Sequence, residues 1–233
     1  MQRPELINSF LSLFDQPRYL EIGVEKGLTF KEIKADWRVG VDPQPKFEDE
    51  SFLGEDFEMF RIPSDKYFAD HVEIGKPFDV AFIDGLHTAE QTLRDFTNVM
   101  SFTKNDAVVI IDDIRPANWC EALHLDLWLK VVPMTDGSYT GWTGDVFKLL
   151  YLIETFFPSI EMRISAEAPN QVICWKRTKS RLIEKPFASR LYEIATAQYP
   201  QFLLSKQNFT TSSLESIIGE YKQSCAEWAA SGR

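Results

Sequence analysis

The sequence predicts an α/β fold built around a mostly parallel sheet. Short apolar runs typical of buried strands alternate along the chain with segments whose apolar residues recur at helical spacing. This alternation is typical of strand–helix–strand units, which join parallel strands by right-handed crossovers. The 233 residues, of which 44% are hydrophobic, are enough for one large domain or for a domain with an appendage.

Seven segments are predicted to be strands, at residues 19–22, 39–42, 57–61, 78–84, 107–111, 160–164 and 172–175. The clearest is Phe78–Asp84, whose continuous apolar run suits a parallel strand that is covered on both faces. Only a short stretch, with Ala-Glu-Ala-Pro-Asn at its centre, separates the last two segments. That short connection indicates an antiparallel hairpin.

Helical periodicity predicts a helix directly after Asp65 and others at residues 4–15, 30–37, 88–100, 116–131, 145–153, 187–194 and 213–228. Thr88-Ala-Glu-Gln91 matches a capping box, which fixes the start of one of these helices. Pro200 breaks the pattern between the last two. Residues 134–144 contain three glycines and two aromatic rings, which indicate a shaped binding loop.

The composition narrows the range of partners and locations. The net charge is −10, so phosphate backbones are repelled and we expect no nucleic-acid partner. No apolar run approaches the ~18 residues of a membrane span, and no signal peptide opens the chain, so we expect no membrane partner. Three cysteines without a C-x-x-C pair favour reduced thiols and the cytoplasm.

The first strand and the turn after it, Tyr19–Thr29, carry the strongest sign of a ligand. Gly23 and Gly27 allow a tight bend against which a ligand can lie, and the amides at the following helix start carry partial positive charge. A dinucleotide fingerprint would be G-x-G-x-x-G, but Glu21 stands where its first glycine would be, which disfavours a nicotinamide-dependent dehydrogenase. An ordinary strand–turn–helix without a ligand remains the alternative.

Other polar residues follow the later strands. Asp42 lies about 20 residues beyond the first turn, where a nucleotide-binding fold places the acid that binds the ribose hydroxyls. Ser64 and Asp65 follow the third strand, where they could either bind an adenine amino group or cap the next helix. Because ligands bind outside the carboxyl ends of parallel strands, we expect these side chains at one rim.

The same rim is predicted to carry three carboxylates and a histidine. Asp84 and the pair Asp112-Asp113 follow neighbouring strands, whose ends lie about 5 Å apart. Carboxylates so close repel one another unless a cation separates them, and Mg²⁺ suits such ligands. A neutral His87, three residues after Asp84, could take a proton from a hydroxyl group. The alternatives are helix capping by the acids and a backbone-bonded turn histidine.

Together these motifs resemble a known family. Glu21-x-Gly23-x-x-x-Gly27-x-Thr29, then Asp42, Phe82-Ile-Asp84-Gly-x-His87 and Ile111-Asp112-Asp113 are similar to the class I S-adenosylmethionine-dependent methyltransferases, in particular the metal-dependent O-methyltransferases. The closest likeness is to the group that includes macrolide-sugar and cephalosporin-pathway enzymes, over residues 17–176. Catechol-type relatives carry a lysine at the position of His87 and Asp-Asn at that of Asp112-Asp113.

The resemblance implies a Rossmann-like, doubly wound sheet of seven strands in the order 3-2-1-4-5-7-6, with strand seven antiparallel and helices on both faces. It implies that S-adenosylmethionine is the cofactor and that its amino acid end is held by Glu21, Gly23, Gly27 and Thr29. Asp42 would bind its ribose, and Ser64 and Asp65 its adenine, with Asp84 also near the cofactor. Mg²⁺ or another divalent cation would be held by Asp84, Asp112 and Asp113.

We therefore expect residues 1–180 to form a methyltransferase domain, with its N-terminal helix at 4–15, and residues 181–233 to form a helical extension. The expected reaction is Mg²⁺-dependent O-methylation of a small molecule or sugar hydroxyl, with His87 as general base. The alternatives are a metal-independent N- or O-methyltransferase and a non-catalytic cofactor-binding protein. The Tyr139–Trp142 loop could stack on an acceptor ring. The C-terminal helices are expected to cover the sheet edge or to pair with a second copy of the chain.

Overall fold

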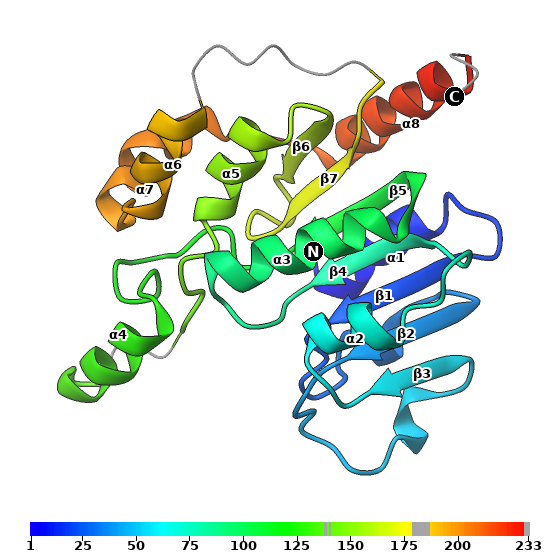
Figure 1. Ribbon diagram of the computed structural model, residues 1–233, viewed down its shortest axis with the longest axis horizontal. Helices are drawn as coiled ribbons and strands as arrows, with labels where there is room; N and C mark the ends of the chain where they lie inside the picture. The colour runs from blue at the N-terminus through cyan, green and yellow to red at the C-terminus, as the bar shows by residue number, and fades with distance from the viewer. Residues whose placement is uncertain (138, 140, 179–186, 231–233) are drawn as a thin grey trace. The chain divides into compact units, whose positions relative to one another are not determined.

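The computed structural model describes residues 1–137, 139, 141–178 and 187–230 (Figure 1). The chain forms two compact units. The first unit consists of residues 1–86 and 93–112, and the second of residues 87–92 and the chain from 113 onward. The chain therefore passes between the units at Leu86–His87, at Thr92–Leu93 and at Asp112–Asp113. Each unit is described by itself below.

The first unit contains five parallel strands: β1 (Arg18–Ile22), β2 (Trp37–Val41), β3 (Phe57–Phe60), β4 (Phe78–Ile83) and β5 (Thr103–Ile111). β1 lies between β2 and β4, while β3 and β5 pair with the outer sides of these two strands. Every residue of β4 is buried, as its continuous apolar run predicts. The five predicted strands are all present.

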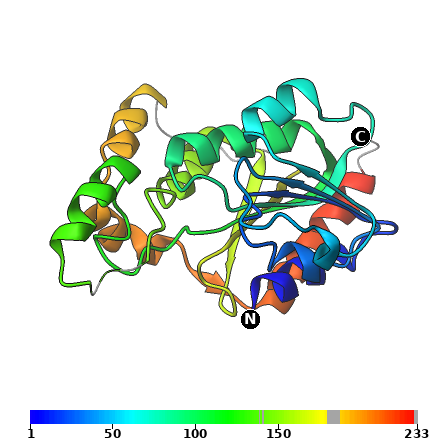
Figure 2. The same ribbon diagram turned by 90° about the horizontal axis from the view of Figure 1, so that it is seen from below.

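Helices lie on both faces of these strands. α1 (Arg3–Leu11) and α2 (Ser64–Asp70) are on opposite faces, as Figure 2 shows in dark blue and cyan. α3 (Ala89–Ser101), of which residues 93–101 belong to this unit, begins at the predicted capping box, where the Thr88 hydroxyl accepts the Gln91 N–H at 3.3 Å. The unit also contains the 3₁₀ turns η1 (Phe30–Glu32) and η2 (Ser51–Leu53).

The predicted helix at 30–37 was wrong. Only the single turn η1 forms there, and Ile33 already has extended backbone angles. Asn8 on α1 explains the early end, because its side chain accepts the Lys34 N–H at 2.8 Å and donates to the Glu32 carbonyl at 2.9 Å. These bonds replace the ones that a continued helix would make.

The second unit contains the antiparallel hairpin that the sequence predicts, formed by β6 (Ile160–Ser165) and β7 (Val172–Lys176). A short strand, β8 (Thr211–Ser212), pairs in parallel with β6. Hydrogen bonding joins all strands in the order β3-β2-β1-β4-β5-β7-β6-β8. The predicted order is therefore confirmed, and the unpredicted β8 extends it by one strand.

The helices of the second unit are α4 (Leu125–Val131), α5 (Lys148–Phe156), α6 (Phe187–Ala195), α7 (Tyr199–Ser205) and α8 (Leu214–Ala230), with 3₁₀ turns η3 (Val132–Met134) and η4 (Lys206–Asn208). The helix predicted from residue 116 begins only at Leu125. The Asn118 side chain accepts the N–H groups of Cys120 and Glu121, which holds residues 118–121 in a turn. Pro200 lies in the first turn of α7 and so starts a helix.

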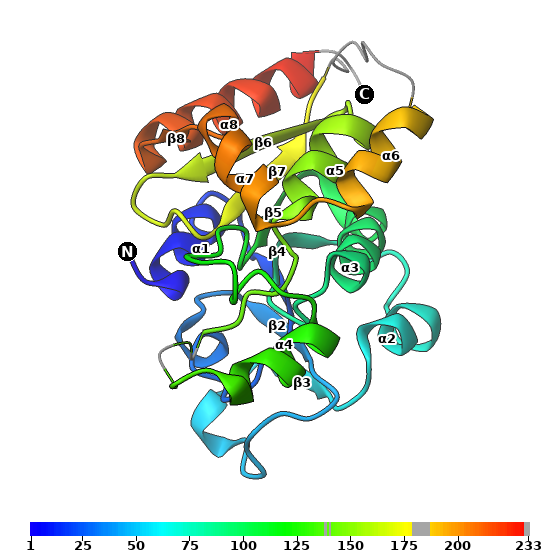
Figure 3. The ribbon, with the colours of Figure 1, turned by 90° about the vertical axis from the view of Figure 1, so that its left-hand side faces the viewer.

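The C-terminal residues complete the second unit. The predicted domain boundary at 180/181 lies outside the described residues. Beyond it, β8 adds a strand beside β6 at the end of the strand order. α8 lies along β6 (Figure 3), and its Tyr221 ring packs edge-on against Trp175 with centroids 5.9 Å apart. Among the described residues, no helix has the length and apolar character to cross a membrane.

Candidate active site

The glycine turn after β1 is shaped by a close backbone contact within the first unit. Gly23 has a φ of +88°, and a Cβ atom there would lie 2.0 Å from the carbonyl oxygen of Asp84. Gly27 has a φ of +70°, and its Cβ would lie 2.8 Å from the Leu53 side chain. Both positions therefore require glycine for steric reasons. The predicted bend is present, and it crosses directly over the end of β4.

Glu21 lies beneath this turn, in the interior of the first unit. Its side chain is 1% exposed and accepts the Tyr19 hydroxyl at 2.6 Å. Burial raises the pKa of Glu21 to about 8. The neighbouring guanidinium of Arg38 is also buried, and it donates to the carbonyls of Phe30 and Leu53. The predicted cofactor residue is thus a buried acid in a polar cluster.

Asp42 follows β2 and connects two loops. Its carboxylate accepts the Glu25 N–H and the Gln44 N–H, each at 2.8 Å. Glu25 has a φ of +48°, so one of these bonds supports a backbone conformation that non-glycine residues rarely adopt. The acid predicted to bind ribose therefore also orders the turn that follows β1.

Ser64 and Asp65 connect α2 to α3 in the first unit. The Ser64 hydroxyl donates to Asp95 at 2.5 Å, and Asp65 pairs with Arg94 at 3.4 Å. Pro63 occupies the N-cap position of α2, so neither residue fills the capping position that was the alternative to adenine binding. Ser64 is buried and the Asp65 side chain is 45% exposed.

Asp84 and Asp112 follow directly after β4 and β5, whose last residues are paired in register. The guanidinium of Arg3, at the start of α1, contacts both carboxylates. Its Nη1 atom lies 3.3 Å from Asp84 Oδ2, and its Nε contacts Oδ2 of Asp112. Asp112 is 2% exposed. The positive charge that two such carboxylates require is therefore supplied by the chain itself.

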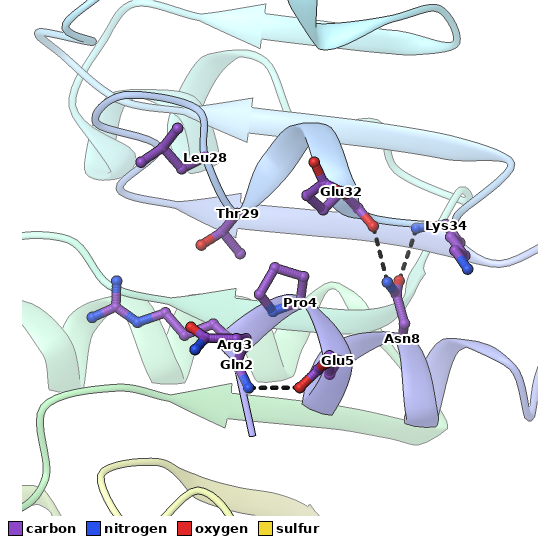
Figure 4. A pocket seen from close by; sticks show the side chains of 9 residues that line it. All are labelled: Gln2, Arg3, Pro4, Glu5, Asn8, Leu28, Thr29, Glu32 and Lys34. Atoms are coloured by element: carbon purple, nitrogen blue, oxygen red, sulfur yellow. Dashed lines mark hydrogen bonds between the residues drawn. The ribbon is translucent and has the colours of Figure 1, made fainter.

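A cavity of about 630 Å³ lies beside Arg3 in the first unit (Figure 4). It is lined by the start of α1 and by residues of the 28–34 segment, which include the predicted cofactor residue Thr29. Figure 4 shows Thr29 facing Pro4, with the Arg3 side chain extending at one end of the cavity. Asn8 closes the opposite end through its bonds to residues 32 and 34.

His87 is held by the loop that precedes α5 in the second unit. Its Nδ1 atom lies 3.0 Å from the Trp142 carbonyl oxygen and 3.1 Å from Asp113 Oδ2. Gly144 has a φ of +60°, and a Cβ there would lie 1.6 Å from the His87 carbonyl oxygen. Because a carbonyl can only accept, the bond to Trp142 requires the proton on Nδ1 and leaves the lone pair on Nε2.

Asp113 belongs to the second unit, although it follows Asp112 directly in the chain. It is buried, with a left-handed backbone at φ +61°. Oδ2 lies beside His87, and Oδ1 accepts the Asn170 amide at 3.0 Å. β5 ends at Ile111, so both aspartates lie beyond the end of the strand and their side chains are not constrained to opposite faces.

The predicted binding loop contributes a tryptophan at the histidine. The ring centroids of His87 and Trp142 are 5.2 Å apart, and those of Trp142 and Trp128 on α4 are 5.7 Å apart. Trp142 Nε1 donates to the Leu123 carbonyl at 2.8 Å, which fixes its ring. Tyr139 packs edge-on against Trp119, 5.8 Å away. Trp142 is therefore the ring of this loop that adjoins the histidine.

Comparison with known proteins adds to this geometry. The chain is similar in fold to cofactor-bound Rv0187 from MTB, with 16% identity, 76% of this chain and 79% of that chain covered, and a TM-score of 0.54. It is also similar to an O-methyltransferase from Bacillus cereus, with 16% identity, coverage of 75% and 80%, and a TM-score of 0.50. No curated protein matches the sequence.

Residues 20–114 match a family model described as a methyltransferase domain. This part of the chain is therefore similar to a methyltransferase domain. The matched range extends from one residue before Glu21 to one residue after Asp113, so it contains every residue that the sequence predicted for the site. The match does not reach α8 or the C-terminal helices before it.

Three residues around the candidate site residues were missed by the sequence analysis: Arg3, Arg38 and Asn170. A single arginine near the N-terminus has no pattern that separates it from a solvated charge, and Asn170 lies in a turn where asparagine is common. Arg38 lies inside an apolar strand, in Trp37–Val41, and a charged residue at such a position is a usable sign of a buried partner.

The protein should lose stability as pH rises because of Glu21. The raised pKa means that folded Glu21 retains its proton above the usual value of 4.5, so its favourable contribution is lost between about 4.5 and about 8. Glu21→Gln should remove this loss, which approaches about 1.4 kcal/mol per pH unit. Urea denaturation across pH 5–8 would measure it. Exposed Glu58 on β3 offers the control Glu58→Gln, and an equal effect of both changes would contradict the assignment.

Proposed function

We propose that this protein is a class I methyltransferase that transfers the methyl group of S-adenosylmethionine to a hydroxyl group of a small molecule, with His87 as general base. The observation that supports this proposal most directly is the bond from His87 Nδ1 to the Trp142 carbonyl. It places the lone pair on Nε2, where a neutral imidazole can accept a proton near neutral pH.

The glycine turn supports the proposed cofactor. Gly23, Gly27 and Thr29, with Glu21 beneath them, are proposed to hold the amino acid end of S-adenosylmethionine. The B. cereus O-methyltransferase of similar fold is in complex with SAH. Asp42 uses two acceptor positions for backbone amides, and a carboxylate offers about four, so two remain for ribose hydroxyls. We propose that Ser64 and Asp65 lie around the adenine of the cofactor and that Asp84 lies near its sulfur end.

A divalent cation fits the donor set. Carboxylates are the ligands that Mg²⁺ prefers, and Asp84 and Asp112 are the pair that we propose to hold it. Asp113 is the third predicted ligand, but its observed contacts with His87 and Asn170 favour a different role. A bound ion would favour the alkoxide form of the acceptor hydroxyl. Arg3 would have to leave the two carboxylates for the ion to bind.

Arg3 also favours a second candidate, a metal-independent methyltransferase. Its guanidinium already neutralises the two carboxylates, one of them almost fully buried. In that case the proton transfer to His87 alone would activate the acceptor. The two candidates differ in one property that can be measured, the affinity of the protein for Mg²⁺.

In the proposed reaction, Nε2 of His87 takes the proton of the acceptor hydroxyl. The acceptor oxygen forms a bond to the methyl carbon as the carbon–sulfur bond breaks, and the electron pair of that bond stays on sulfur. The products are a methyl ether and S-adenosylhomocysteine, with the proton on His87. In-line placement of the three reacting atoms is what the site must supply.

The aromatic pair supports an acceptor that contains a ring. Trp142 lies against the His87 ring, and Trp128 continues the pair onto α4. Leu127 and Leu129 of α4 are 50% and 57% exposed, which suits an acceptor with an apolar part. A sugar ring or an aromatic ring could stack on such a surface. We therefore propose a ring-bearing hydroxyl compound as the acceptor class.

The cellular location and the oligomeric state of the protein are also proposed. Cys120, Cys174 and Cys225 form no disulfide bond, which supports the predicted cytoplasmic location. Tyr192 on α6 is 74% exposed and Leu204 on α7 is 79% exposed. Such exposed apolar side chains support the proposal that the C-terminal helices pair with a second copy of the chain.

S-adenosylhomocysteine should stabilise the protein, and NAD should not. A ligand that binds only the folded state raises the free energy of unfolding by about 2.7 kcal/mol when it is present at 100-fold excess over its Kd. Thermal-shift measurements with both compounds would test this. Asp42→Asn should weaken the binding while retaining one amide acceptor for the loops. Equal stabilisation by NAD would refute the cofactor assignment.

Arg3→Ala should raise the affinity for Mg²⁺, because the competing cation is removed from Asp84 and Asp112. Isothermal titration with Mg²⁺, without cofactor or acceptor, would measure this. Arg61→Ala is the matched control, since Arg61 pairs with Glu48 and Glu50 away from these residues. No Mg²⁺ binding in wild type or in Arg3→Ala would reject the metal-dependent candidate and leave the metal-independent one.

A further inference from the structure

Asp113 lies between two side chains of the second unit. Its Oδ2 atom is 3.1 Å from Nδ1 of His87, and its Oδ1 atom accepts the Nδ2 amide of Asn170 at 3.0 Å. Asp113 is 7% exposed, so these contacts are shielded from solvent. Both carboxylate oxygens therefore already have a polar partner inside the same unit.

The orientation of Asn170 follows from its own bonds. The N–H of Arg115 donates to Asn170 Oδ1 at 3.1 Å, and the N–H of Ile114 donates to the Asn170 carbonyl at 3.1 Å. Because Oδ1 is occupied by a donor, the amide nitrogen must be the atom that faces Asp113. The hairpin loop between β6 and β7 thus fixes the donor that holds Asp113.

The backbone at Asp113 points to the same arrangement. Its φ of +61° lies in the left-handed region, which aspartate and asparagine tolerate better than most residues. Non-glycine residues persist there when the surrounding structure holds them, and such positions cluster at functional sites. The contacts with His87 and Asn170 are what holds the residue here.

We infer that Asn170 and Asp113 are positioning residues that fix the ring and the tautomer of His87, so that its Nε2 atom faces the acceptor as the base. This inference rests on the proposed function, and it assigns Asp113 to the histidine. Asn170 holds the Asp113 carboxylate, which shares the Nδ1 proton with the Trp142 carbonyl, and the lone pair stays on Nε2.

The test reads the tautomer of His87 directly and needs no acceptor. Protein labelled with [¹⁵N]histidine gives long-range ¹H–¹⁵N spectra that distinguish a protonated ring nitrogen from a bare one. The chain has three histidines, and the spectrum of His87→Gln identifies the signals of His87. At a pH about two units above the usual histidine pKa, the wild type should show the proton on Nδ1. A proton on Nε2 would overturn the inference without any further variant.

Asn170→Asp tests the role of Asn170. It keeps the size of the side chain and the acceptor for Arg115, but removes the amide donor and places a second carboxylate beside Asp113. The His87 signals should shift, because the Asp113 carboxylate beside Nδ1 loses the amide that orients it. Asn105→Asp, on an exposed part of β5, adds the same charge as a control. Unchanged His87 signals in a folded Asn170→Asp protein would overturn the inference.

The kinetic readout follows once an acceptor is known. Asn170→Asp should lower kcat about 10–100-fold at unchanged KM, because partners that orient a functional histidine typically contribute that much. Its affinity for S-adenosylhomocysteine should equal that of the wild type. If the wild type fails to bind S-adenosylhomocysteine, the proposed function fails. The tautomer of His87 is measured independently, so the two failures are distinguishable.

Discussion

The local structure of the site depends on two places where a glycine lets one backbone touch another. In the first unit, Gly23 lies so close to the Asp84 carbonyl that any side chain would clash. In the second unit, a side chain at Gly144 would clash in the same way with the carbonyl of His87. Asp84 and His87 are only three residues apart in the chain, so both contacts fix the ends of a single turn. A Cβ at either glycine would displace a residue of the proposed chemistry.

Charge is the second constraint, because each acid of the site has its own partner. Arg3 contacts Asp84 and Asp112, and Asn170 with His87 engages Asp113. Buried carboxylates without such partners would be costly. The consecutive residues Asp112 and Asp113 thus belong to two different polar groups.

The sequence predicted the strands because they are apolar runs that alternate with helices, whereas their order was implied by the resemblance to the methyltransferase family. Asp42, Asp84 and Asp112 directly follow strands, as the apolar runs before them predict. The prediction failed where a single side chain redirected the backbone, as Asn8 does after η1 and Asn118 does before α4. The partners Arg3 and Asn170 come from distant parts of the chain, and nothing in their own neighbourhood marks them.

The most direct test of the account is a crystal structure of the protein grown with S-adenosylhomocysteine and Mg²⁺. The account predicts electron density for the ligand against the Gly23–Gly27 turn. It also predicts that Nδ1 of His87 keeps its bond to the Trp142 carbonyl. A ligand bound away from the glycine turn, or a His87 ring turned so that Nε2 faces Asp113, would contradict it.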